Sequence, residues 1–283
     1  MDAGHGGAPL APAAPPDAPD DTPATLLIRL AGPMQSWGTQ SRFLVRDAGS
    51  EPSKSGVIGL ICAALGRPRT APVDDLARLR FGVRIDHPGV VRRDYHTANG
   101  APYHRASTGR RAGAGIWHDG KLEDQTIVTT RYALHDASFL AAFQGHLGQL
   151  RTIDTALASP IWATYLGRKA FVASVPIRLP DVAPHGPGLR LGTIEEAFAA
   201  IPWTPWGRRG ADGTTESDAS EGQRLRCIVD AAADDAEASA WRDDVPIDFA
   251  ARTFGARLVR TTWVVAPVTQ GTAVPPRTGE ATQ

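Results

Sequence analysis

The sequence predicts an α+β fold, because segments with strand and helix patterns alternate through its first half. A strand pattern at 25–31 precedes a helix pattern at 52–68. Two strand patterns follow at 79–86 and 90–97, and an amphipathic helix pattern covers 147–160. The order strand, helix, strand, strand, helix is typical of a ferredoxin-like unit, with room for an inserted hairpin before the last helix.

The first strand and the first helix have clear local signals. Residues 25–31 alternate between apolar and other side chains, which places Arg29 on the face opposite three large aliphatic residues. The helix pattern begins after Ser53, a favourable N-cap residue, and ends at Gly66 just before Pro68. The apolar stripe of this helix consists of Val57, Ile58, Ile61, Ala64 and Leu65.

The later patterns are less regular. Residues 98–125 are rich in glycine, arginine, serine and tyrosine and have no core pattern, as expected of a long functional or disordered excursion. Strand or mixed character then returns up to Gly145. After about Pro176 the pattern thins to a short helix near 193–201, a strand-like LRCIVD segment and a last strand at 256–267.

These patterns divide the chain into four parts. Residues 1–24, rich in alanine, proline, glycine and aspartate, are expected to form a disordered leader. Residues 25–180 are expected to form the α+β domain, and 181–267 a smaller C-terminal region that contains strands. Residues 268–283 are expected to form a flexible tail.

Composition narrows the class of protein. No apolar run is long enough to span a membrane, and the N-terminus lacks the basic and apolar regions of a signal peptide. The two cysteines, Cys62 and Cys227, can neither complete a tetrahedral zinc site nor build a disulfide framework. We therefore expect a cytoplasmic protein without metal, cofactor or membrane partner.

The net charge of zero conceals an asymmetry along the chain. Residues 24–120 carry a net charge of +7, whereas residues 221–250 carry −5. A basic half with an acidic counterpart suits polyanion binding on one face. A solvated surface without special purpose is the alternative.

The segment between the first strand and the first helix, LAGPMQSWGTQSRF, is far longer than a turn requires. Gly32 and Gly38 would let a ligand approach the backbone, Trp37 could stack on a base, and the helix N-terminus with Lys54 could face a phosphate. The GxxxxGK[ST] spacing of a P-loop is absent. In the structural alternative, Trp37 is a core residue and the glycines are ordinary turn residues.

Three further stretches carry polar groups suited to RNA. Tyr95 and His96 lie at a strand end beside two arginines and could act in acid–base chemistry or bind a phosphate or base. The segment 104–111, HRASTGRR, could follow a backbone by charge, and Arg168 and Lys169 lie in a glycine turn. For each stretch, a structural histidine or a solvated surface turn is the alternative. Together these signals favour a platform for single-stranded RNA.

The motifs, taken in order, resemble the CasD family. They are LLIRLAGPMQSWGTQSRF, EPSKSGVIGLICAALGR, RDYHTANG, HDASFLAAF and SPIWATYLGRKAF. The resemblance extends from about Thr25 to Val175, whereas the C-terminal third matches only in its length and final strand. Proteins of this family are the subunits that bind the 5′ handle of crRNA in Cascade, the type I-E CRISPR surveillance complex.

The resemblance implies an RRM-like domain of the repeat-associated (RAMP) type with an inserted β-hairpin thumb, here at about 98–128, and a non-catalytic role. The implied partners are the crRNA 5′ handle, a backbone subunit of the CasC type, a large PAM-reading subunit of the CasA type and, through the complex, target DNA. Guide pairing, rather than this subunit, would determine sequence specificity. The candidate RNA-binding residues are Arg29, Gly32, Gln35, Ser36, Trp37, Gly38, Arg42, Lys54, Ser55, His96, Arg105, Arg110, Arg111, Arg168 and Lys169.

The alternative function is a metal-independent endoribonuclease that cuts repeat RNA, as relatives in type I-C systems do. Such an enzyme needs a base and an acid around the 2′-OH and the leaving oxygen. The candidate set is Tyr95, His96 and Lys54. The type I-E character of the motifs argues against this alternative, because those systems use a separate processing subunit.

Overall fold

The computed structural model describes residues 11–38, 45–98, 117–118, 121–122, 127–182, 185–203, 208–209, 215–216 and 224–268. The described helices are α1 (Lys54–Leu65), α2 (Asp74–Ala77), α3 (Leu147–Ala158) and α4 (Ile194–Ala200). The described strands are β1 (Pro23–Gln35), β2 (Val45–Arg46), β3 (Arg80–His87), β4 (Val90–Ala98), β5 (Trp117–His118), β6 (Lys121–Leu122), β7 (Ile127–His146), β8 (Leu189–Leu191), β9 (Arg208–Arg209), β10 (Thr215–Glu216), β11 (Arg224–Asp230), β12 (Ala238–Asp248) and β13 (Thr253–Val265).

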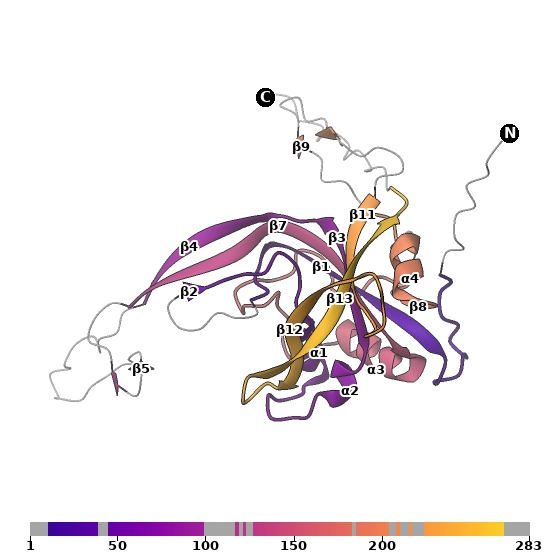
Figure 1. Cartoon of the computed structure of the whole chain (residues 1–283), viewed down its shortest axis with the longest axis horizontal. Helices are drawn as coiled ribbons and strands as arrows, with labels where there is room; N and C mark the ends of the chain where they lie inside the picture. Colours follow the sequence, from indigo (N-terminus) through magenta and orange to yellow (C-terminus); the bar gives the residue numbers. More distant parts are fainter. Residues whose placement is uncertain are drawn as a thin grey trace, which may run out of the picture.

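One nine-stranded sheet organises the described part of the chain (Figure 1). Its order is β12-β13-β11-β3-β7-β1-β8, with β2 and β4 pairing β7 outside this path. All its strand pairs are antiparallel except β2 with β7. The α+β class predicted from the sequence is therefore confirmed, and short helices are few compared with strands.

The capping signals at the first helix are confirmed. The Ser53 side chain accepts a hydrogen bond from the Gly56 backbone N–H, and Gly66 ends the helix in the left-handed conformation, with φ of 68°. The strand pattern at 25–31 lies inside β1, which continues to Gln35 because its last residues still pair with β7. Pairing with the long strand β7 thus extends β1 beyond the residues whose side chains alternate between apolar and polar.

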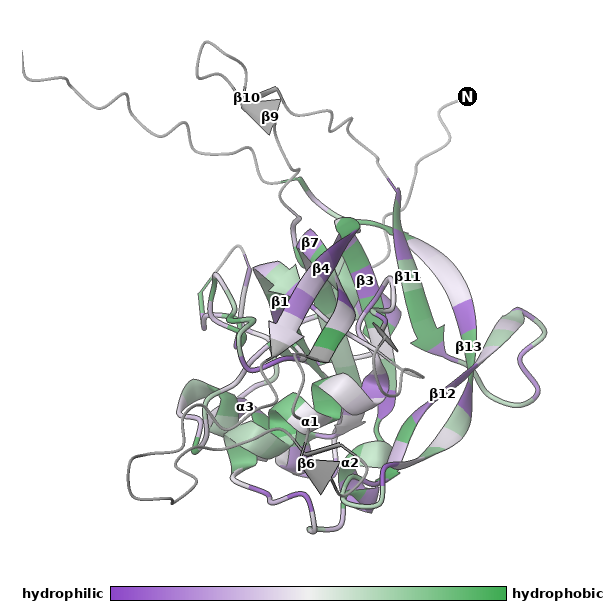
Figure 2. Ribbon diagram, turned by 90° about the vertical axis from the view of Figure 1, so that its left-hand side faces the viewer, coloured by the Kyte–Doolittle hydropathy of each residue, from purple (hydrophilic) through white to green (hydrophobic). Residues whose placement is uncertain are grey.

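Helices cover both faces of the sheet. Side chains of alternate β1 residues, including Leu26 and Ile28, pack with those of α1 and α3, which lie together on one side in Figure 2. The intervening Leu27 packs instead with α4 through Phe198. Two separate buried clusters result, one on each face of the sheet. No helix in the described part of the chain is long and apolar enough to cross a membrane.

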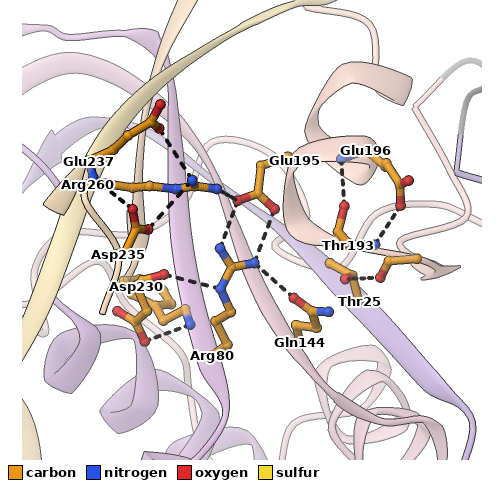
Figure 3. A network of polar contacts seen from close by, with 12 residues as sticks. Thr25, Arg80, Gln144, Thr193, Glu195, Glu196, Asp230, Asp235, Glu237 and Arg260 are labelled. Atoms are coloured by element: carbon orange, nitrogen blue, oxygen red, sulfur yellow. Dashed lines mark hydrogen bonds and ion pairs between the residues drawn. The ribbon is translucent and has the colours of Figure 1, made fainter. Parts of the chain in front are cut away.

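The C-terminal strands continue the central sheet, because β11 pairs directly with β3. A polar network fixes α4 to the same strands (Figure 3). The Glu195 carboxylate accepts hydrogen bonds from Arg80 on β3 at 2.7 and 3.1 Å and from Arg260 on β13 at 2.8 Å. Burial raises the pKa of Glu195, but the hydrogen bonds from Arg80 and Arg260 outweigh this effect and lower it to about 2.

The leader prediction is wrong for the residues from 11 onward, whereas residues 1–10 lie outside the described part. Ala14 donates its backbone N–H to Leu189 of β8, so the segment adds to the sheet edge. The Arg151 guanidinium on α3 donates to the carbonyl oxygens of Pro15, Pro16 and Ala18. The composition indicated disorder because the prolines and alanines of this segment form no strand or helix pattern. Their backbone carbonyl oxygens nevertheless accept hydrogen bonds from Arg151.

An arm formed by β4 and the first half of β7 projects from the sheet (Figure 1). The two strands pair from Val90 with His135 to Ala98 with Ile127. The predicted thumb at 98–128 falls largely on residues outside the described part, apart from the two-residue strands β5 and β6. The arm thus consists of the two strands that flank this predicted insertion in the sequence.

Candidate nucleic-acid interface

The structure brings together two motifs that are about 130 residues apart in sequence. One is the segment at 32–38, called the loop, which consists of the end of β1 and the three residues after it, and the other is the turn at 165–171. The Ser36 backbone N–H donates to the carbonyl oxygen of Leu166 at 3.1 Å. Gly167 has φ of +91°, and a Cβ there would overlap the carbonyl oxygen of Ser36. A Cβ at Gly32 would lie 2.8 Å from the carbonyl oxygen of Val172. Glycine is therefore required at both contacts for the two backbones to pack.

Gln35 and Trp37 are buried inside this frame of loop and turn rather than exposed to a ligand. The Trp37 indole N–H donates to the Gln35 Oε1 at 2.9 Å, and Gln35 donates to the carbonyl oxygens of Leu30 and Ala137. The indole, 1% exposed, lies against Gly56 in the first turn of α1. The stacking role considered for Trp37 therefore does not fit this conformation, and the structural alternative is the one observed.

The N-terminus of α1 already holds a protein anion. The Asp244 carboxylate accepts from the Lys54 backbone N–H at 2.8 Å, and Lys54 Nζ donates to Asp230 at 3.0 Å. Arg257 bonds to both carboxylates. Burial lowers the pKa of Lys54, and the charge of Asp230 opposes this shift. The phosphate site expected at this helix end is thus occupied, because two acidic residues from the C-terminal strands neutralise it.

The remaining candidate contact residues near the loop and turn differ in exposure. Gly38 and Lys169 are exposed, Ser55 and Arg168 are half-buried, and Ser36 is buried. The Arg168 guanidinium lies 5.5 Å from the centroid of the Phe171 ring, a cation–π contact that holds it in place. The edge where loop and turn meet therefore presents backbone and cations rather than an aromatic side chain.

The arm presents the other cationic and aromatic groups. All side chains of Val91–Thr97 are exposed, and alternation places Arg93 and Tyr95 on one face and Arg92 and His96 on the other. β2 pairs with the same part of β7, and the arm exposes all the side chains of Val91–Thr97, so it suits a surface that is covered in an assembly. Arg42, Arg105, Arg110 and Arg111 lie outside the described residues.

The three candidate catalytic residues do not form a described cluster. Lys54 is buried and bonded to Asp230, whereas Tyr95 and His96 are exposed on the arm. The backbone carbonyl oxygen of His96 accepts a hydrogen bond from the Thr129 hydroxyl. No group of three or more potential metal ligands occurs among the described residues.

Arg29 lines a cavity of about 730 Å³ that is also lined by Val172 and Ala173, which directly follow the turn. Its guanidinium donates to Nδ1 of His185 at 3.1 Å. Because arginine can only donate, Nδ1 is the unprotonated nitrogen of this ring. Burial and the charge of Arg29 both lower the pKa of His185. The Arg29 guanidinium is therefore held at this cavity by His185.

Sequence reasoning missed His185, Asp230 and Asp244. The acidic segment near the C-terminus was visible as a charge excess, but no local pattern links it to the start of α1. The contact between Lys54 and Asp244 spans 190 residues. Only the fold, which pairs β11 with β3, brings these groups together.

Comparison with known proteins gives consistent matches. Residues 25–260 match the family described as "CRISPR-associated protein (Cas_Cas5)". The chain is 32% identical over 160 residues to the CRISPR system Cascade subunit CasD of Escherichia coli (strain K12), covering 54% of this chain and 69% of that protein.

Two solved structures are also similar. A chain described as "CRISPR RNA-guided surveillance complex" is 34% identical, with a TM-score of 0.64 over 88% of this chain and 95% of the other. A chain described as "Crystal structure of Cas protein" is 34% identical, with a TM-score of 0.59 over 86% of this chain and 97% of the other. The similarity thus includes the C-terminal strands, where sequence motifs alone were weak.

Proposed function

Because the chain belongs to the Cas5 family of CRISPR-associated proteins, we propose that it is a non-catalytic subunit of a Cascade-type surveillance complex and binds the 5′ handle of crRNA. The observation that carries this proposal is the similarity over 95% of a chain from an RNA-guided surveillance complex. In such a complex it would cap the backbone filament, contacting a CasC-type backbone subunit and a large CasA-type subunit. Target DNA would be reached only through the complex.

The proposed RNA contacts are the exposed groups of the frame and the arm. Lys169 and Arg168 would neutralise phosphates, and the Gly38 backbone would allow a nucleotide to approach closely. Arg93 and Tyr95 on the arm would supply charge and stacking. Gln35, Trp37 and Lys54 would act indirectly by holding these groups in place.

The strand and helix order also supports a finer fold assignment. β1, α1, β3, β7, α3 and β8 follow one another in a β-α-β-β-α-β order, and the sheet order of their strands is β3-β7-β1-β8. This is the arrangement of a ferredoxin-like unit. We assign this unit as the RAMP domain and the arm as the base of its thumb.

The test is a binding assay with the purified chain and an RNA that carries the repeat-derived 5′ handle. Tight binding that weakens steeply with salt supports the proposal, because several phosphates would be neutralised. Equal affinity for an unrelated RNA of the same length contradicts handle recognition. The double substitution Arg168→Ala and Lys169→Ala tests the frame. Arg69→Ala with Arg78→Ala, at two exposed arginines outside the frame and the arm, is the matched loss of two charges.

The same RNA decides the question of catalysis. The chain is incubated with repeat RNA in EDTA, and the products are separated on a sequencing gel. Intact RNA is expected, because the candidate lysine is bonded to Asp230 away from the exposed His96. Site-specific cleavage that disappears in His96→Ala would replace the binding role by an endoribonuclease.

A further inference from the structure

The cavity beside Arg29 is lined by other kinds of side chain than the proposed RNA interface. It is lined mainly by aliphatic side chains, and among the described residues its only ionisable lining groups are Arg29, Arg178 and His185. None of these described lining residues is a phenylalanine, tyrosine or tryptophan. Nucleobases are held mainly by stacking on aromatic rings, so these walls suit an aliphatic group better than a base.

The cavity also has a positive charge, that of Arg29, without a described hydrogen bond to a carboxylate. The charge of Asp86 acts on Arg29, but Arg84 already donates two hydrogen bonds to this carboxylate, at 2.6 and 3.0 Å. The guanidinium of Arg29 makes its described hydrogen bond to neutral His185. Most of its N–H donors therefore remain available to an acceptor that enters the cavity.

The second arginine at the cavity does not share this property. Arg178 bonds to the carboxylates of Asp154 and Asp181 at distances between 2.6 and 3.1 Å. These bonds outweigh its burial and raise its pKa. An incoming carboxylate would consequently be directed to Arg29.

The rim of the cavity is apolar and open to solvent. Val172 is 62% exposed and Val175 is 38% exposed, although both line the cavity. A small molecule inside the cavity would leave Val172 largely uncovered, whereas a polypeptide segment would cover it. The rim thus favours a protein occupant.

We propose that this cavity is the docking site for a segment of a partner polypeptide that places an aliphatic side chain between the valines and a carboxylate on Arg29. The proposal deepens the function proposed above, since the partner would be a protein subunit of the same complex. Bidentate pairing of a carboxylate with the arginine would fix the register of the segment. RNA would remain on the frame and the arm.

The test uses co-expression of the chain with the protein subunits encoded beside its gene and with crRNA. Val175→Trp fills the cavity, Arg29→Met removes the charge but keeps an unbranched side chain, and Ile247→Trp is the control at an exposed site outside the cavity. Thermal denaturation establishes that each variant is folded. We expect both cavity variants to lose one protein subunit at least tenfold while the crRNA retained per chain and the control are unchanged.

The contacting segment is identified by a photo-crosslinking residue at Val172 in the purified complex. A crosslinked peptide with an aliphatic residue next to aspartate, glutamate or a C-terminus supports the proposal. Retention of every subunit by both cavity variants overturns it, as does a crosslink to crRNA instead of protein. Absence of crRNA from a complex that still needs the cavity would contradict RNA binding but not docking.

Discussion

Replacing Trp37 by alanine separates a structural tryptophan from an RNA-stacking one. The side chain is 1% exposed, and its N–H donates to Gln35, which has no other described donor to its Oε1. Truncation of a buried tryptophan to alanine costs about 3–5 kcal/mol. For a chain of this size, each kcal/mol lowers Tm by roughly 2–4 °C, so a fall of about 10 °C is expected.

Trp37→Phe measures how much of that loss of stability comes from the hydrogen bond to Gln35. It keeps most of the apolar volume but leaves the buried Oε1 of Gln35 without its donor, a loss of about 1–3 kcal/mol. Circular dichroism during heating measures Tm for both variants, and fluorescence anisotropy measures binding of the handle RNA well below each Tm. The expected order of stability is wild type, then Trp37→Phe, then Trp37→Ala.

A Trp37 that stacks on RNA would give a different result. If the indole stacked on a base, alanine would lose about 1–3 kcal/mol of binding. A Trp37→Ala protein with wild-type Tm and at least tenfold weaker binding would refute the burial of the indole inside the frame. Arg168→Ala with Lys169→Ala is the complementary control, because Lys169 is exposed and loss of the Arg168 cation–π contact costs about 0.5–1 kcal/mol, well below the cost of Trp37→Ala.

Three further measurements follow from the structure. Loss of the two phosphate contacts in the Arg168→Ala, Lys169→Ala protein should reduce the slope of log binding constant against log salt by about 1.4. Glu195 has a pKa lowered from 4.5 to about 2, so its contribution to stability is present above about pH 4.5 and is lost as the pH falls towards 2. In urea unfolding, Glu195→Gln should therefore differ most from wild type at neutral pH. Burial raises the pKa of Cys62 to about 11 and of Cys227 to about 12, so neither thiol should react with iodoacetamide at pH 8 until the protein is unfolded.

Local signals predicted the elements that depend on neighbouring residues. Ser53 and Gly66 define the ends of α1 through bonds within four residues, and the alternation of β1 follows from its own side chains. The sequence therefore yielded the order of elements and the α+β class. The full length of β7 was less clear, since its two halves have different partners, β4 in the arm and β3 in the sheet.

The chemistry of the site depended on distant partners and was harder to predict. In the sequence, Lys54 at a helix N-terminus indicates a phosphate ligand. In the fold, Asp230 and Asp244, both more than 170 residues away, bond to it instead. Trp37 has the same identity whether it stacks on RNA or packs on Gly56. Its burial follows from its packing against Gly56 of α1 and its hydrogen bond to the buried Gln35, which no pattern near Trp37 encodes.

The residues that revealed the family are mostly those that build the frame. Gln35, Trp37, Gly56 and Gly167 are held by bonds and close contacts that few other residue types satisfy. Exposed cations such as Lys169 have no comparable internal constraint. A shared motif of this kind therefore specifies the shape of the loop and turn, whereas affinity and RNA preference can change through surface residues without loss of the frame.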